Sequence, residues 1–284
     1  MKPSLFLPAL LLAALPATLD AAPGTVNLPI VQKYPGSLDF AKFGNACAPL
    51  GDLNGDGNPD LAIGVEGLFR SVYISFLGAD QSLISALTIQ ENEGGLPIGS
   101  APAGSRFGAA LANLGDLDGD GLPELAVGAP GEGSVYILFL QSDGAVRDFH
   151  KFGPGGNTEF GSSCAAVGDL DGNGVTELAV GAPFDDTGTI GTDSGAIHVF
   201  FLNSDGTSSS STKIANGLGG ANDGLIGAGD NFGSSCALIG DLNFDGFVEV
   251  AVGSRSSDIG GTNKGLLFTF SLTAAGTAQS FREF

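Results

Sequence analysis

Four copies of one acidic nine-residue loop recur along this chain, at residues 52–60, 116–124, 169–177 and 241–249. Every copy has Asp, Asn or Glu at its first, third, fifth and ninth positions and glycine at its sixth. This spacing is typical of a Ca²⁺ loop, because Ca²⁺ takes about six to eight oxygen ligands and glycine permits the sharp turn that directs the seventh carbonyl inward. Asp, Asn and Gly also occur in ordinary turns, but four copies in one frame indicate a repeated cation site.

The predicted metal ligands are the side chains at positions one, three, five and nine of each loop, together with the residue at position seven. They are Asp52, Asn54, Asp56, Asn58, Asp60, Asp116, Asp118, Asp120, Leu122, Glu124, Asp169, Asp171, Asn173, Val175, Glu177, Asp241, Asn243, Asp245, Phe247 and Glu249. We therefore expect about four Ca²⁺ ions per chain.

An EF-hand loop begins with the same pattern, but it needs a glutamate at its twelfth position and a helix on either side. Here the twelfth position holds Ile or Val inside a short apolar run such as 125–128. These runs are rich in β-branched residues and end at glycine, which is typical of strands. The loop therefore connects one strand to the next, and the EF-hand is rejected.

Residues 1–22 have the features of a signal peptide: Lys2, then an apolar stretch, then small residues. The apolar stretch is too short, and too interrupted by proline, to favour a membrane anchor. We expect residues 23–284 to form one secreted, extracellular domain with no transmembrane segment after cleavage.

The formal net charge of the chain is −20. Thirteen of its 31 acidic residues lie at ligand positions of the four loops, so bound cations account for much of the acidity. Binding to nucleic acid needs a basic surface and is not expected.

Three cysteines occupy one equivalent position of the repeats, five residues before the first Asp of the loop. They are Cys47, Cys164 and Cys236, and the second repeat has Leu111 there. A position that accepts either Cys or Leu is typically buried and apolar. We predict buried free thiols, and a disulfide or redox role remains the alternative.

The similarity between the copies extends well beyond the loops. A Phe-Gly pair precedes each loop, and an alternating aromatic strand follows it, at 72–77, 135–140, 197–202 and 267–272. A more polar strand comes next, as at 146–152. One unit therefore has about 60 residues and four antiparallel strands, approximately 40–91, 104–153, 157–215 and 229–284. Repeated four-stranded sheets predict an all-β propeller with four recognisable blades.

Phe-Gly, the acidic loop and then Gly-Ala-Pro, as at 128–130 and 181–183, resemble the FG-GAP repeat of integrin α-subunit N-terminal β-propellers and their secreted relatives. The resemblance covers about residues 40–284. It implies that the loops bind Ca²⁺ structurally and that the propeller serves adhesion or ligand binding. The first and fourth copies depart from it, with Gly64-Val-Glu66 and Gly253-Ser-Arg255 in place of Gly-Ala-Pro.

The two ends of the chain leave the closure of the propeller open. Residues 26–34 and 278–284 both resemble a fourth strand, yet one closed ring needs only one of them. Three arrangements fit: a small closed propeller of four or five blades, part of a longer array, or self-association that closes the ring.

In a four-stranded antiparallel unit, the metal loops lie at one end and the variable connections at the other. Loops on a rigid scaffold commonly carry recognition, so we expect an extracellular protein or glycan ligand on the face opposite the Ca²⁺ loops. The most distinctive residues of that face are Phe69, Arg70, Arg106, Phe184 and Arg255.

Catalysis is not predicted, because the only histidines, His150 and His198, lie in expected strands and have no nucleophile paired with them in sequence. The sequence thus predicts a secreted, calcium-binding, non-catalytic adhesion or ligand-binding module. The alternative is a carbohydrate-binding or propeller accessory domain of an extracellular hydrolase.

Overall fold

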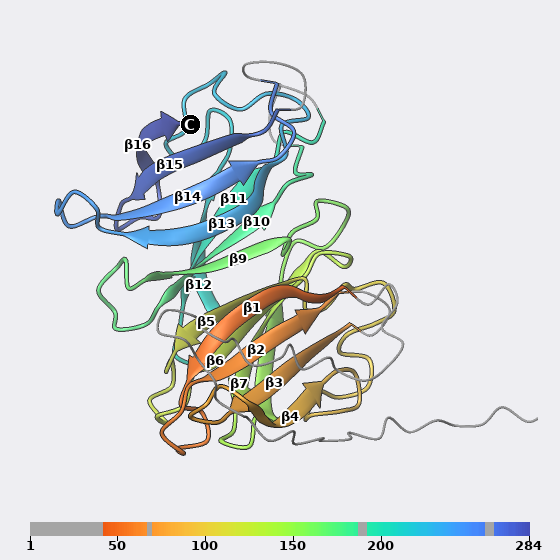
Figure 1. The fold of residues 1–284 in the computed structure, drawn as a ribbon. Helices are drawn as coiled ribbons and strands as arrows, with labels where there is room; N and C mark the ends of the chain where they lie inside the picture. The colour runs from red at the N-terminus through yellow and green to blue at the C-terminus, as the bar shows by residue number, and fades with distance from the viewer. Residues whose placement is uncertain (1–41, 67–69, 187–191, 259–263) are drawn as a thin grey trace, which may run out of the picture.

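The computed structural model describes residues 42–66, 70–186, 192–258 and 264–284. The predicted signal peptide, the strand predicted at 26–34 and Phe69 lie outside these ranges. Within them the chain forms sixteen strands and no helix, as expected of an all-β protein (Figure 1).

The strands form four antiparallel sheets, each made of four strands that are consecutive in sequence. We call these sheets blades 1 to 4. Blade 1 contains β1 (Phe43–Gly51), β2 (Asp60–Val65), β3 (Ser71–Leu77) and β4 (Leu83–Ile89); blade 2 contains β5 (Ala110–Gly115), β6 (Glu124–Ala129), β7 (Ser134–Leu140) and β8 (Val146–Phe152); blade 3 contains β9 (Ser163–Gly168), β10 (Glu177–Ala182), β11 (Ala196–Leu202) and β12 (Ser208–Ile214); and blade 4 contains β13 (Phe232–Gly240), β14 (Val248–Ser254), β15 (Leu266–Leu272) and β16 (Ala278–Glu283).

The strands predicted within the described residues are confirmed to within one residue. Each third strand begins one residue earlier than its apolar pattern suggests, and β8 coincides with the predicted 146–152. In blade 2 every residue of β6 and β7 is buried. Such strands read as continuous apolar runs because both faces of the sheet are covered.

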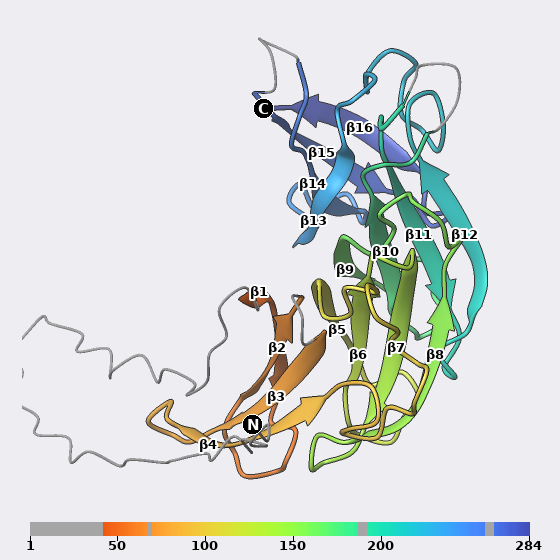
Figure 2. The ribbon, with the colours of Figure 1, turned by 90° about the vertical axis from the view of Figure 1, so that its right-hand side faces the viewer.

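Successive blades pack face to face, and their inner strands β1, β5, β9 and β13 lie next to one another in that order. Three hydrophobic clusters lie between blades 1 and 2, 2 and 3, and 3 and 4. The four blades are arranged as in a β-propeller, which confirms the predicted fold class. Figure 2 shows them following an arc, with blade 1 at one end and blade 4 at the other.

Each blade therefore has two faces. We call the face toward the next blade in sequence the forward face and the face toward the previous blade the rear face. Within the described ranges, the forward face of blade 4 and the rear face of blade 1 form no hydrophobic cluster with each other.

The cysteine prediction is partly wrong. All three thiols are free, and Cys164 is buried, but Cys236 is only partly buried and Cys47 is exposed. The position lies on the rear face, so its burial depends on the preceding blade. In the described structure no blade precedes Cys47.

A substitution within an interblade cluster should weaken the fold strongly. Leu178→Ala removes a fully buried side chain between blades 2 and 3 and should lower the free energy of unfolding by about 2–5 kcal/mol. Ile84→Ala, at an exposed strand position, is the matched control and should change it by about 0.5 kcal/mol or less. Urea denaturation followed by circular dichroism measures both, and equal losses would contradict the burial pattern.

Candidate metal loops and the opposite face

Each acidic loop joins the first strand of a blade to the second, and the four loops share one backbone conformation. The N–H of the sixth-position glycine donates to the carboxylate of the first Asp in every copy. These bonds are Gly57 to Asp52 at 2.8 Å, Gly121 to Asp116 at 2.9 Å, Gly174 to Asp169 at 2.9 Å and Gly246 to Asp241 at 3.0 Å. The first carboxylate is thereby fixed at the centre of each turn.

The seventh position is also held in the same way in all four loops. Its N–H donates to the side-chain oxygen of the fifth position, at 2.6–2.9 Å. The donors are Asn58, Leu122, Val175 and Phe247, and the acceptors are Asp56, Asp120, Asn173 and Asp245. The predicted ligand positions are therefore brought together around one turn in each copy.

In loops 2 and 3 the carboxylates converge as a metal site requires. Potential ligand atoms of Asp116, Asp118 and Asp120 lie within 4.8 Å of one another, as do those of Asp169, Asp171 and Glu177. These two acidic clusters can hold a metal ion.

The ninth-position glutamates of the same loops are fully buried. One oxygen of Glu124 accepts the N–H of Leu117 at 2.5 Å, and one oxygen of Glu177 accepts that of Leu170 at 2.5 Å. The other oxygen, Oε1, has no hydrogen-bond partner among the described residues in either case. Burial, followed by the charges of the neighbouring aspartates, raises the pKa of both glutamates to about 7. A bound cation would supply the missing partner of a buried oxygen, so both loops fit Ca²⁺.

The ninth-position carboxylates of loops 1 and 4 are engaged differently. Asp60 accepts the N–H groups of Leu53 and Leu77, at 3.1 and 3.0 Å. Glu249 accepts the N–H of Leu242 and the hydroxyl of Ser271, both at 2.7 Å. Both oxygens already have protein donors in these loops, a distinction that the loop sequences do not reveal.

Loop 2 also has a cationic neighbour. Arg147 of β8 forms ion pairs with Asp118 at 2.5 Å and Asp120 at 3.3 Å. The guanidinium balances part of the charge of this cluster, and it would compete with a metal for the same oxygens.

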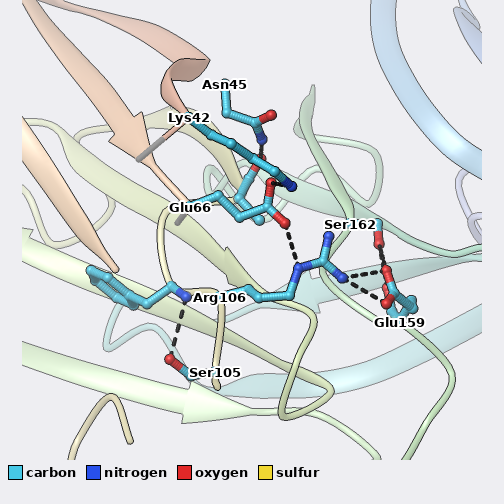
Figure 3. Close-up of polar contacts among 9 residues, drawn as sticks. Lys42, Asn45, Glu66, Ser105, Arg106, Glu159 and Ser162 are labelled. Carbon is cyan, nitrogen blue, oxygen red and sulfur yellow. Dashed lines mark hydrogen bonds and ion pairs between the residues drawn. The ribbon is translucent and has the colours of Figure 1, made fainter. Parts of the chain in front are cut away.

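At the other end of the blades, a polar network links three of them (Figure 3). Glu66 replaces the proline of Gly-Ala-Pro in blade 1, and its side chain is only 4% exposed. It pairs with Lys42 at 3.1 Å and, at short range, with Nε of Arg106. Nη1 of Arg106 donates to both oxygens of Glu159 at 2.6 Å. Ser162 donates to the same carboxylate at 3.3 Å.

Arg106 stays charged in this network. Burial opposes the charged form, but the hydrogen bonds to Glu159 and Glu66 outweigh it and raise the pKa of the guanidinium. The residue thus joins blades 1, 2 and 3.

In blade 4, too, a charged residue stands in place of the proline of Gly-Ala-Pro and forms side-chain contacts. Arg255 of blade 4 donates to Asn231 at 3.4 Å and lies over the ring of Phe184, 5.3 Å from its centroid. Glu66 and Arg255 each contact the residue before a Phe-Gly pair, Lys42 or Asn231. Sequence reasoning missed these pairings, although the charged residues in place of proline were their signal.

Of the other predicted face residues, Arg70 is partly buried and its Nε has no hydrogen-bond partner in the described ranges. His198 lies in β11 against the ring of Phe160, with Nε2 at 3.7 Å from Asp185. This packing fits a structural role for the histidine.

Part of the chain is similar to a known family of repeats. Residues 116–180, which run from loop 2 through strands β6 to β9 and loop 3 into β10, match the FG-GAP-like repeat. Part of this β-propeller is therefore similar to the FG-GAP-like repeat.

Three similar curated proteins are integrin α-subunits. Integrin alpha-PS5 of Drosophila melanogaster is 37% identical over 152 residues, which are 46% of this chain and 14% of the relative. Integrin alpha-7 of Homo sapiens is 37% identical over 49% of this chain and 12% of its own length. Integrin alpha-4 of Xenopus laevis is 32% identical over 55% of this chain and 16% of its own. The matched part is thus about one seventh of these relatives.

A solved structure from Lactobacillus plantarum covers 79% of this chain and 51% of its own, at 16% identity and a TM-score of 0.41, and this distant likeness supports no argument. The part of the chain that the structure describes has no helix with the length and apolar character needed to cross a membrane.

Loss of the Arg106 side chain should destabilise the protein, because Glu66 would stay buried with only the exposed Lys42 as its partner. We expect Arg106→Ala to lower the free energy of unfolding by about 1–3 kcal/mol, less than for a fully buried pair because Arg106 is about one third exposed. Urea denaturation of the single variants and of Arg106→Ala/Glu66→Gln gives the coupling. Additive losses would show that Arg106 and Glu66 are not coupled.

Proposed function

We propose that this chain is an extracellular, non-catalytic adhesion or ligand-binding module, with Ca²⁺ bound structurally in its four acidic loops. The similarity to integrin α-subunits over about half of the chain carries this proposal. The Lys2, apolar and small-residue pattern of the N-terminal segment supports secretion, with residues 1–22 as the signal peptide and 23–284 as the propeller domain.

The chemistry of the loops supports Ca²⁺ as the ion. Aspartate, asparagine and glutamate supply only oxygen ligands, which suit a hard divalent cation and do not favour Zn²⁺. When bound, Ca²⁺ supplies positive charge where several carboxylates of one loop would otherwise repel one another. The loops hold their first carboxylate through backbone donors, so a cation would find that ligand already oriented.

The opposite face supports ligand recognition. It presents the variable connections between blades, and there the guanidinium of Arg255 lies over the ring of Phe184. An exposed arginine over a partly buried aromatic ring offers both charge and apolar area, and Arg and aromatic residues are enriched in protein recognition sites. The expected partner is an extracellular protein or a glycan.

The second candidate function is a carbohydrate-binding or accessory propeller domain of an extracellular hydrolase. Glycan binding that depends on Phe184 would favour this version, because sugars stack on aromatic rings. A hydrolase panel tests the non-catalytic part of the proposal, and turnover by the purified chain would refute it.

Calcium should both bind to and stabilise the propeller. Calorimetry on chelator-treated protein should count about four sites with Kd of roughly 10⁻⁵–10⁻³ M. A hundredfold excess of Ca²⁺ over Kd adds about 2.7 kcal/mol per site, so the Tm should rise with Ca²⁺ and fall with EGTA. An unchanged Tm in EGTA, or a preference for Zn²⁺, would contradict the calcium proposal.

The four loops should differ in affinity. Glu177 has a buried oxygen available to a cation, whereas both oxygens of Asp60 already have protein donors. Glu177→Gln should therefore remove one of the tighter sites, and Asp60→Asn should mainly affect a weaker one. Calorimetric titration of the two matched variants separates these outcomes, and loss of the weaker class from Glu177→Gln would reverse the ranking.

Ligand binding should depend on the face opposite the Ca²⁺ loops. On arrays of glycans and extracellular proteins, Arg255→Ala should weaken binding to any captured ligand about tenfold or more, as an arginine at the centre of a recognition site does. Phe244→Ala is the matched control, because Phe244 is a highly exposed aromatic residue within a metal loop. If Phe244→Ala abolished binding and Arg255→Ala did not, the ligand would bind at the end of the blades that carries the metal loops. That result would contradict the prediction.

A further inference from the structure

The forward face of blade 4 is built like the other forward faces but is left exposed. In blades 1 to 3, three apolar positions of this face lie in the interblade clusters. They are Leu50, Leu53 and Val72; Leu114, Leu117 and Val135; and Val167, Leu170 and Ile197. The counterparts in blade 4 are Ile239, Leu242 and Leu267, which are 39%, 62% and 43% exposed. Their type is retained although nothing in the described structure covers them.

The rear face of blade 1 shows the complementary condition. The phenylalanine of Phe-Gly is fully buried in blades 2, 3 and 4, but Phe43 is only partly buried. Leu61 is also partly buried, while its counterparts Leu125, Leu178 and Val250 are almost fully buried. Cys47 is exposed.

One backbone contact recurs at each of the three interfaces. A Cβ added to Gly64, Gly128 or Gly181 would lie 2.0–2.1 Å from the carbonyl oxygen of the Phe-Gly glycine of the next blade. Those glycines are Gly108, Gly161 and Gly233. No side chain can occupy this position, because the next blade's turn rests directly on it. Glycine here is therefore a requirement of blade docking.

The two surfaces that would form a fourth contact of this kind are both present, but they do not meet within the described structure. Gly253 keeps the glycine of the docking position, yet a Cβ there would meet only side-chain atoms of Ser234 and Ser235 of its own blade. Gly44, in the Phe-Gly turn of blade 1, would meet nothing within 4 Å among the described residues.

We propose that two copies of this chain associate head to tail, with the Phe43-Gly44 turn of each copy docked on Gly253 of the other. The rear face of blade 1 then covers Ile239, Leu242 and Leu267 of the other copy. A second copy fits because the chain itself carries both matching surfaces. Two such contacts close a two-fold ring of eight blades, which lies within the size range of propellers. This inference does not depend on the proposed ligand.

The repeat also predicts which atoms meet across the new interface. Inside the chain, Sγ of Cys236 lies 3.8 Å from the carbonyl oxygen of Ala179 in the preceding blade. The counterparts of these two residues are Cys47 and Ala251. In the two-copy ring, Cys47 of one chain lies against Ala251 of the other and loses its exposure.

The native protein provides the first test. Light scattering should give the mass of two chains at high concentration, and the reaction of Cys47 with a thiol reagent should slow as the dimer forms. In Ala251→Cys, mild oxidation should link Cys47 to the new thiol between two chains. A monomer at all concentrations overturns the proposal. So does a disulfide between these positions within one chain, because it would mean that the ring closes with four blades.

Two variants of the docking surface complete the test. Gly253→Val fills the position where the turn docks, and Leu267→Lys places a charge on the covered face. Both should give monomers and at least a tenfold weaker association. Ile98→Glu, at an exposed loop position 77% accessible, is the matched control and should remain dimeric. The Tm of each variant reports whether the blade still folds. A dimer unaffected by the two docking variants, in proteins that fold, would refute this interface.

Discussion

The structure depends on covering both faces of every blade. A four-stranded sheet in this chain is apolar on its forward and rear faces alike, so a blade alone would expose two hydrophobic surfaces to water. Stacking the blades buries these hydrophobic surfaces only if the backbones of neighbouring blades approach closely at one point. The contact between Gly128 and the carbonyl of Gly161 is such a point. This geometry explains why Phe-Gly and the penultimate glycine of the second strand occur together in all four repeats.

Most of this fold could be predicted from the sequence because the same residue pattern recurs in each unit. The strand boundaries, the position of the loops and the division into four sheets follow from periodic residues within each unit, and the structure confirms them. Burial at the ends of the array does not follow from such periodicity. Cys47 and Cys164 occupy the same repeat position, but only Cys164 has a preceding blade to cover it. The difference is set by neighbours in space and leaves no trace in the repeat itself.

The candidate metal loops also combine features that the sequence predicts with features that it does not. Side chains of the loops could be named in advance because one turn holds them all. The engagement of the ninth-position oxygens could not, since the second donors to Asp60 and Glu249 come from Leu77 and Ser271 at the end of the third strand. Arg147 reaches loop 2 from the fourth strand. Likewise, the network around Arg106 combines residues of three blades, and the sequence indicated only Arg106 itself and the charge of Glu66 in place of proline.

The metal loops and the blade stacking are physically connected. The second residue of the loop is Leu53 in blade 1 and Leu117 in blade 2, and each lies in the cluster shared with the next blade. The backbone N–H of the same leucine donates to the ninth-position carboxylate. Because one residue takes part in both structures, an ion that orders the loop also holds an apolar side chain in the interblade core. If the loops bind Ca²⁺ as proposed, its removal would therefore weaken contacts between blades as well as the loop itself. In blade 4 the backbone N–H of the corresponding Leu242 likewise donates to the Glu249 carboxylate. Its side chain, however, has no following blade to pack against within the described chain. Its loop gains less from the packing of the array, so the last loop should be the least stabilised of the four until another blade covers it.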